Sequence, residues 1–152
     1  MEEVAFTIQS DGKPVSISEF GKYFFWLRAC YVLALDEYHF SLEEDEGDDV
    51  AIRSMTKEEL AESIMERAKY MTYDELRSVA NRVLTPEEDL MLVDIYRRNP
   101  FETVLCGIGI ALTAALIVSG GKFEFKVTGI KIEIPPIAEG IYKLRKALGR
   151  KR

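Results

Sequence analysis

The side chains that most often carry catalysis or bind metals are few in this chain of 152 residues. His39 is the only histidine, so a histidine-based metal site is excluded, and acid–base catalysis would depend on carboxylates tuned by burial. Cys30 and Cys106 lie in apolar stretches, which is typical of inert buried thiols. Because they form no C-x-x-C pair, they indicate neither zinc binding nor a disulfide framework.

A run of eight carboxylates lies between Asp36 and Asp49, with no Lys or Arg among them. Ca²⁺ prefers clustered oxygen ligands, but this run lacks the alternating ligands, central glycine and closing glutamate of a calcium-binding loop. Like charges repel one another, so we expect a solvated loop here. The sequence therefore predicts neither a metal nor another cofactor.

Two glycine-containing segments share only their composition with phosphate-binding loops. Gly107-Ile108-Gly109 lacks the third glycine of a dinucleotide fingerprint and falls inside a predicted helix, where no free amides would meet a pyrophosphate. Ser119-Gly120-Gly121-Lys122 lacks the spacing of a P-loop. A small enzyme that uses carboxylates and tyrosines stays an alternative, but no catalytic motif supports it.

The most unusual feature is a stretch of nineteen residues without a charge, from Thr103 to Gly121. Asn99 and Pro100 suit the start of a helix, and we predict one helix over residues 103–119. Small side chains recur there at every fourth position: Thr103, Gly107, Ala111, Ala115 and Ser119. Such a stripe lets another backbone approach closely, so these five residues are the candidate helix-contact site.

Three environments are open for the 103–119 helix: lipid, the contact between two chains, or the core of a soluble domain. Its length falls just short of the roughly 30 Å hydrocarbon core of a bilayer. A membrane span would also place either the basic end outside, against the positive-inside tendency, or the acidic body outside without a signal peptide. A re-entrant or interfacial helix, or one buried in an oligomer, avoids this conflict.

The positive charge is concentrated at the C-terminal end of the sequence. Residues 1–121 carry a net charge of −12 and residues 122–152 a net charge of +6. The acidic body disfavours nucleic acid as a partner. The candidate residues for binding an anionic membrane surface or an acidic protein are Lys143, Arg145, Lys146, Arg150, Lys151 and Arg152.

The N-terminal half shows clear signals for a strand and several helices. Val4, Phe6 and Ile8 alternate with polar residues and predict a strand. A capping box that starts at Ser16 predicts a helix to about Asp36. Thr56, Thr72 and Thr85 lead three further helix starts, and helices are predicted over 57–70 and 73–84. Residues 90–96 could continue a third helix or form a buried strand entered after a single turn, and the strand is favoured.

The C-terminal segment combines a hairpin with a short helix. A turn at Thr128-Gly129 would pair Val127 with Ile130, Phe125 with Ile132 and Phe123 with Ile134, although one long bulged strand is an alternative. Beyond Pro135-Pro136, the spacing of the apolar residues predicts a basic amphipathic helix; these are Ile137, Ile141, Leu144 and Leu148.

Together these signals predict an α+β fold with an acidic body over residues 1–98 and a second part over residues 99–152, or one continuous domain. We expect a non-enzymatic, self-associating module that forms homo-oligomers and is cytoplasmic or located at or within the membrane. The alternative is a soluble protein-binding domain with 103–119 as its core helix.

Overall fold

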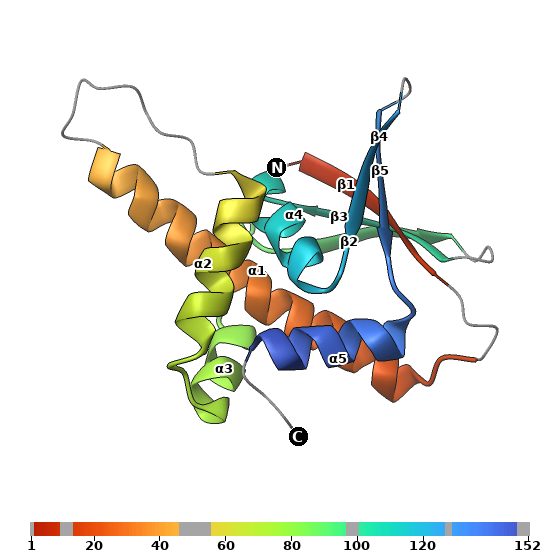
Figure 1. Ribbon diagram of the computed structural model, residues 1–152, viewed down its shortest axis with the longest axis horizontal. Coiled ribbons are helices and arrows are strands. Elements are labelled where there is room, and N and C mark those ends of the chain that lie inside the picture. The colour runs from red at the N-terminus through yellow and green to blue at the C-terminus, as the bar shows by residue number, and fades with distance from the viewer. Residues whose placement is uncertain (1, 10–13, 46–55, 97–100, 127–128, 149–152) are drawn as a thin grey trace.

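The structure is a computed structural model that describes residues 2–9, 14–45, 56–96, 101–126 and 129–148 (Figure 1). The described residues form five strands and five helices, which confirms the predicted α+β class. In chain order these are β1 (Glu2–Ile8), α1 (Ile17–Asp45), α2 (Lys57–Ala68), α3 (Tyr73–Ala80), β2 (Met91–Tyr96), β3 (Phe101–Gly107), α4 (Gly109–Val118), β4 (Lys122–Lys126), β5 (Gly129–Ile134) and α5 (Ile137–Ala147).

The five strands form one mixed sheet in the order β2-β3-β1-β5-β4. β1 is antiparallel to β3 over its whole length, whereas its parallel pairing with β5 is registered only at Thr7–Glu133 and Ile8–Ile134. Strands from both predicted parts of the chain, 1–98 and 99–152, therefore share one sheet. One face of the sheet is apolar and buried, because Phe6, Ile8 and their neighbours on that face enter the core.

The central element of the core is α1, which packs against α2, α3, α4 and α5. Residues 29–35 of this helix are all buried, so its middle is enclosed on every side. Figure 1 shows α1 running diagonally behind α2, with α5 lying across its N-terminal half. A helix that is apolar all round belongs in the interior of a domain, and this describes α4, which has seven of its ten residues buried and packs against α1.

The predicted helix starts are confirmed at three positions. Ser16 Oγ accepts a hydrogen bond from the Glu19 amide at 3.0 Å. Thr56 caps α2, and Thr72 forms a complete capping box with Glu75 at the start of α3. Each cap satisfies a backbone N–H that has no partner within the helix.

The single helix predicted over 103–119 is wrong, because these residues form the end of β3 and then α4. Thr103 and Val104 are β-branched and suit a strand, and β3 gains backbone pairing with both β1 and β2. The spacing of four misled the prediction because it is also even: Thr103 and Gly107 lie on the same face of a strand as well as of a helix.

The predicted hairpin over 123–134 is confirmed, but its register is shifted by two residues. β4 and β5 pair Phe123 with Ile132 rather than with Ile134, and Phe125 with Ile130. The shift keeps the apolar residues on one face and places Lys122 opposite Glu133. Pairs of opposite charge replace the like-charged pairs of the predicted register, which explains the difference. Residues 127–128 lie outside the described part of the chain.

Three other predictions in the middle of the chain are settled by the structure. Residues 91–96 form a strand, as favoured, but the burial predicted for it is wrong at Met91, Leu92 and Val93, which are exposed because β2 lies at the edge of the sheet. The loop expected from Asp36 is wrong up to Asp45, because α1 continues to that residue; 46–49 lie outside the described residues. The strand is entered after a single turn, as the favoured alternative predicts, and in this turn the Thr85 carbonyl accepts hydrogen bonds from the amides of Glu88 and Asp89.

None of the described helices combines the length and the apolar character that a membrane span requires. α4 has 10 residues and is about 15 Å long, against a hydrocarbon core of about 30 Å.

Candidate functional site

The most exposed apolar segment of the structure lies on β2, at one end of the sheet. Among the described strands, β2 pairs only with β3, so its other side is a free edge. Met91, Leu92 and Val93 are 52%, 57% and 48% exposed, although they are consecutive large apolar residues. We call this segment, residues 91–93, the apolar edge. The register against β3 shifts between Leu92 and Asp94, which makes Val93 the extra residue of a β-bulge.

A pocket opens beside the apolar edge, on the face of the sheet that the helices cover. Its volume is about 260 Å³, and we call it the edge pocket. Five of its six lining residues are apolar; the lining consists of Phe20, Phe24, Arg28, Leu90, Leu92 and Leu105. Leu92 therefore belongs both to the free edge and to the pocket wall, so a chain that pairs with β2 would also cover the pocket mouth.

The charged side chains next to the apolar edge are paired within the chain. Arg28 Nη2 lies 3.2 Å from Asp89 Oδ1 and donates a hydrogen bond of 2.7 Å to the Arg82 carbonyl. Glu88 Oε2 lies 2.8 Å from His39 Nε2. These contacts fix the turn that leads into β2 and occupy both carboxylates that precede the edge.

The predicted helix-contact stripe is buried inside the chain. Thr103, Ala111, Ala115 and Ser119 have no exposed surface, and Gly107 is buried as well. The stripe is therefore split between β3 and α4 and faces residues of its own chain. It offers no surface at which a second backbone can approach.

A contact with α1 explains why the stripe has a glycine at position 107. A Cβ on residue 107 would lie 2.9 Å from Tyr31 Oη, so only glycine leaves room for this tyrosine. Tyr31 Oη accepts a hydrogen bond from the Ile108 amide at 2.9 Å and donates one to the Glu88 carbonyl. It thereby joins the turn between β3 and α4 to the turn before β2.

Ser119 ends α4 in a buried hydrogen-bond network. Its hydroxyl donates to the Leu116 carbonyl at 2.8 Å, so the Tyr23 hydroxyl donates to Ser119 Oγ at 3.1 Å. Burial raises the pKa of the Tyr23 hydroxyl well above its ordinary range, and burial also raises the pKa of the Cys30 thiol to about 12. Both groups are neutral near pH 7 and have the character of core residues, not of nucleophiles.

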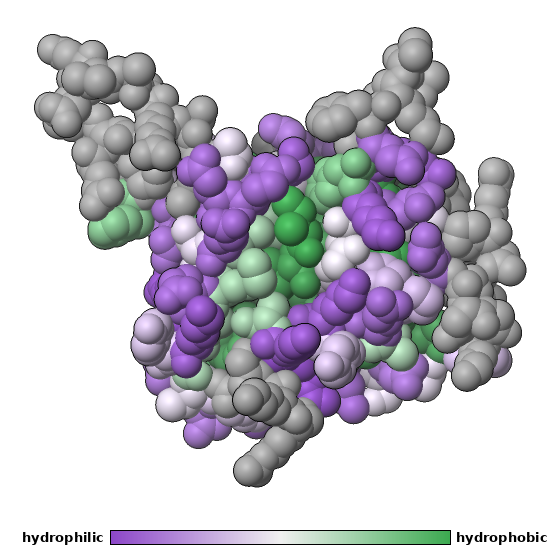
Figure 2. Space-filling model, in the orientation of Figure 1, coloured by the Kyte–Doolittle hydropathy of each residue, from purple (hydrophilic) through white to green (hydrophobic). Residues whose placement is uncertain are grey.

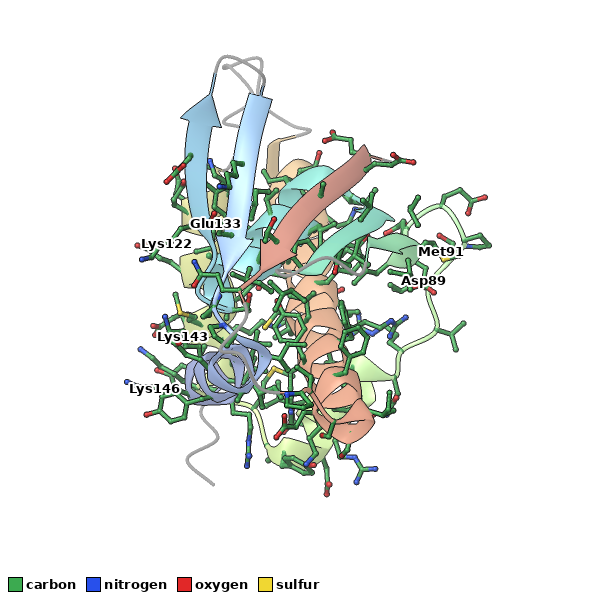
Figure 3. The ribbon with its side chains drawn as sticks, turned by 90° about the vertical axis from the view of Figure 1, so that its right-hand side faces the viewer. Asp89, Met91, Lys122, Glu133, Lys143 and Lys146 are labelled. Atoms are coloured by element: carbon green, nitrogen blue, oxygen red, sulfur yellow. The ribbon has the colours of Figure 1, made fainter. Side chains whose placement is uncertain are left out.

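Three of the six predicted anion-binding residues lie in the part of the chain that the structure describes. Lys143, Arg145 and Lys146 lie on α5, where Lys146 is exposed and Arg145 is partly exposed. Lys143 Nζ lies 3.5 Å from Glu139 Oε1. Figure 3 shows Lys143 and Lys146 on the side of the molecule opposite Met91. The remaining candidates, Arg150, Lys151 and Arg152, lie outside the described residues.

Within the described ranges, no group of three or more His, Cys, Asp or Glu side chains is arranged to hold a metal ion. The apolar edge and the edge pocket were not predicted as a site. The signal available in the sequence was the apolar run Leu90–Val93 in a predicted strand, but nothing local marks a strand as the edge of a sheet.

Comparison with protein-family models, with curated proteins and with solved structures gave no match to this chain.

Proposed function

We propose that the protein is a non-enzymatic association module in which two copies join along their β2 strands. The observation that carries the proposal is the apolar edge, three consecutive exposed apolar side chains on a strand whose outer side has no partner among the described strands. A strand edge presents unpaired N–H and C=O groups, and burying apolar side chains adds to the gain from pairing them. Two β2 strands related by a two-fold axis would join both sheets into one.

The contrast between the two ends of the sheet supports this assignment. β4, at the other end, carries Lys122, Glu124 and Lys126, which protect an edge against pairing. β2 carries a single charged residue, Asp94. Because β2 is the less charged of the two outer strands of the described sheet, pairing through β2 alone gives a closed dimer and not a fibre.

The bulge at Val93 restricts which strands can pair with this edge, and the local charges favour a second copy as the partner. Glu88 and Asp89 are already paired with His39 and Arg28. Two copies therefore meet there with less repulsion than the overall charge of −6 implies.

The mass in solution tests the proposal. We expect the wild-type chain to sediment as a dimer that dissociates on dilution, and Leu92→Lys to be a monomer that keeps the circular dichroism spectrum of the folded chain. Val83→Lys is the matched control, because Val83 is 93% exposed and lies outside the sheet. A wild-type monomer over the whole dilution series would overturn the proposal, as would a Leu92→Lys dimer.

Crosslinking tests the strand pairing itself. In a Cys106→Ser background, where the remaining Cys30 is buried, Met91→Cys, Leu92→Cys and Val93→Cys place a thiol on each position of the edge. Directly opposite residues of paired antiparallel strands are close enough for a disulfide. At least one of the three should form a disulfide-linked dimer under mild oxidation, whereas Val83→Cys should not. Equal crosslinking at Val83 would contradict the pairing.

We propose a second function for the basic side of the molecule, binding to an anionic surface. Its support is the position of three cationic side chains, Lys122, Lys143 and Lys146, on one side in Figure 3, together with Tyr142, which is exposed on α5. Lysine stems and tyrosine rings suit a phospholipid headgroup region. The expected result is co-sedimentation with vesicles that contain phosphatidylserine and not with pure phosphatidylcholine. Lys146→Glu should weaken it and Lys69→Glu, on α2, should not.

A further inference from the structure

The sheet contains a second region of unpaired backbone, between β1 and β5. These parallel strands are joined by ladder pairs only at Thr7–Glu133 and Ile8–Ile134, and by a hydrogen bond from the Gln9 amide to the Ile134 carbonyl at 3.0 Å. Figure 3 shows that the two strands meet at this end and diverge towards their N-terminal ends. The described residues show no ladder between positions 2–6 and 129–132.

The diverging strands enclose a cleft of about 670 Å³, which we call the sheet cleft. Val4 and Ala5 of β1 form one wall, and Phe123 and Ile132 of the β4–β5 hairpin form the other. The start of α4, including Ile110, lies at its floor. Figure 2 shows hydrophobic side chains exposed over α4, bordered by hydrophilic ones. The cleft volume lies within the range of about 300–1,000 Å³ that is common for binding sites.

The backbone N–H and C=O groups that line the sheet cleft are suited to pair with an added strand. In an antiparallel pair, alternate residues direct their N–H and C=O groups away from the partner strand. Because β1 pairs with β3 over its whole length, alternate residues of Glu2–Phe6 direct these groups into the sheet cleft. β5 does the same from the opposite wall, since its other side pairs with β4. An extended segment of four or five residues would pair with these groups.

The side chains around the sheet cleft specify the charge of that segment. Three carboxylates, those of Glu2, Glu3 and Glu58, line it, against one ammonium group, that of Lys57. Lys57 and Glu58 pair with each other, because Lys57 Nζ lies 3.2 Å from Glu58 Oε1, and Lys57 also lies 5.4 Å from the centre of the Phe123 ring. Glu2 and Glu3 therefore leave the lining with a net negative charge. The surroundings are therefore complementary to a cationic partner.

We propose that the sheet cleft binds an extended peptide segment in which apolar residues alternate with Lys or Arg. The peptide adds a strand between β1 and β5, with its apolar side chains over Ile110 and Ile132 on the face that the helices cover and its cationic side chains on the opposite face, towards Glu3. Glu58, at the start of α2, adds to the attraction for a cationic peptide. This mode combines backbone pairing, which supplies affinity, with side-chain contacts, which supply specificity. It uses a surface separate from the apolar edge and does not depend on the proposed dimer.

Fluorescence anisotropy with a labelled peptide of alternating lysine and valine tests the proposal on the full chain. Saturable binding is expected, and Glu3→Lys and Glu58→Lys should each weaken it about tenfold. Glu62→Lys is the matched control, because Glu62 is exposed on α2 outside the cleft, and it should change binding less than about twofold. Circular dichroism of each variant establishes that the fold is kept.

Three results would overturn the proposal: no saturable binding, equal weakening by Glu62→Lys, or undiminished binding of a peptide whose central valine is replaced by proline. Hydrogen exchange separates strand pairing from simple charge attraction, because only pairing protects the amides of β1 and β5 that face the cleft. We expect this protection to appear with the lysine–valine peptide and also in the Leu92→Lys variant. No added protection in β1 would likewise overturn the proposal.

Discussion

At the scale of single residues, Thr103 and Ser119, two members of the predicted helix-contact stripe, differ in the hydrogen bonding of their hydroxyl groups. Thr103 Oγ1 is buried and has no hydrogen-bond partner among the described residues, whereas Ser119 Oγ has two. An unpaired buried hydroxyl lowers stability, and a paired one raises it. We expect Thr103→Val to raise the free energy of unfolding by about 1 kcal/mol and Ser119→Ala to lower it by about 1–2 kcal/mol.

Urea denaturation followed by circular dichroism measures both changes. Val keeps the shape of Thr at position 103, so the comparison isolates the hydroxyl. A loss of stability in Thr103→Val would show that the hydroxyl has a partner, and no loss in Ser119→Ala would show that the Tyr23–Ser119 contact adds nothing.

The stability of Gly107 variants is the second prediction at the residue scale. Its missing side chain provides the space for Tyr31, whose hydroxyl oxygen would lie 2.9 Å from a new Cβ. We expect Gly107→Ala to cost about 2–3 kcal/mol of unfolding free energy through overpacking, and Gly107→Leu to unfold the monomer. The double variant Gly107→Ala/Tyr31→Phe should cost less than the sum of the single changes, because the nearest clashing atom is gone. Additive costs would place the strain elsewhere.

At the scale of elements, the signals that succeeded are local. Ser16, Thr56 and Thr72 marked helix starts because a cap and the amide that it satisfies are three residues apart. The division of 101–118 into β3 and α4 was missed because pairing with β1 and β2, distant in sequence, decides it. The apolar edge and the sheet cleft were missed for the same reason: both depend on strand order, which no short-range pattern encodes.

The buried helix α1 makes the stability of the fold sensitive to alkaline pH. Burial raises the pKa of Cys30 from 9.0 to about 12 and raises the pKa of Tyr23 above 10.0, so the folded state favours the protonated, neutral form of both. The unfolded chain releases these protons first. The contribution of these two groups to the free energy of unfolding is therefore fully present below about pH 9. It decreases as pH rises towards 12, by up to about 1.4 kcal/mol per pH unit for each group.

Urea unfolding at a series of pH values from neutral to alkaline measures this dependence. Cys30→Ala should be less stable near pH 7, since it leaves a cavity, but its stability should fall less steeply between pH 9 and pH 10, where the thiol is the first of the two groups to respond. Parallel curves for wild type and Cys30→Ala would show that the thiol does not titrate with unfolding.

At the scale of the whole molecule, the three proposed surfaces differ in the sign of their response to salt. Each copy carries a net charge of −6, so two copies repel each other and the apolar edge must overcome this repulsion. Salt screens the repulsion, and the dimer should therefore tighten as ionic strength rises from about 0.05 M to about 0.5 M. The sheet cleft and the basic side bind opposite charges, so peptide and vesicle binding should weaken over the same range. Sedimentation, anisotropy and vesicle binding in the same salt series measure these responses. A dimer that dissociates on adding salt would mean that attraction between the acidic body and the basic end joins the chains, and the β2 edge would then lose its role.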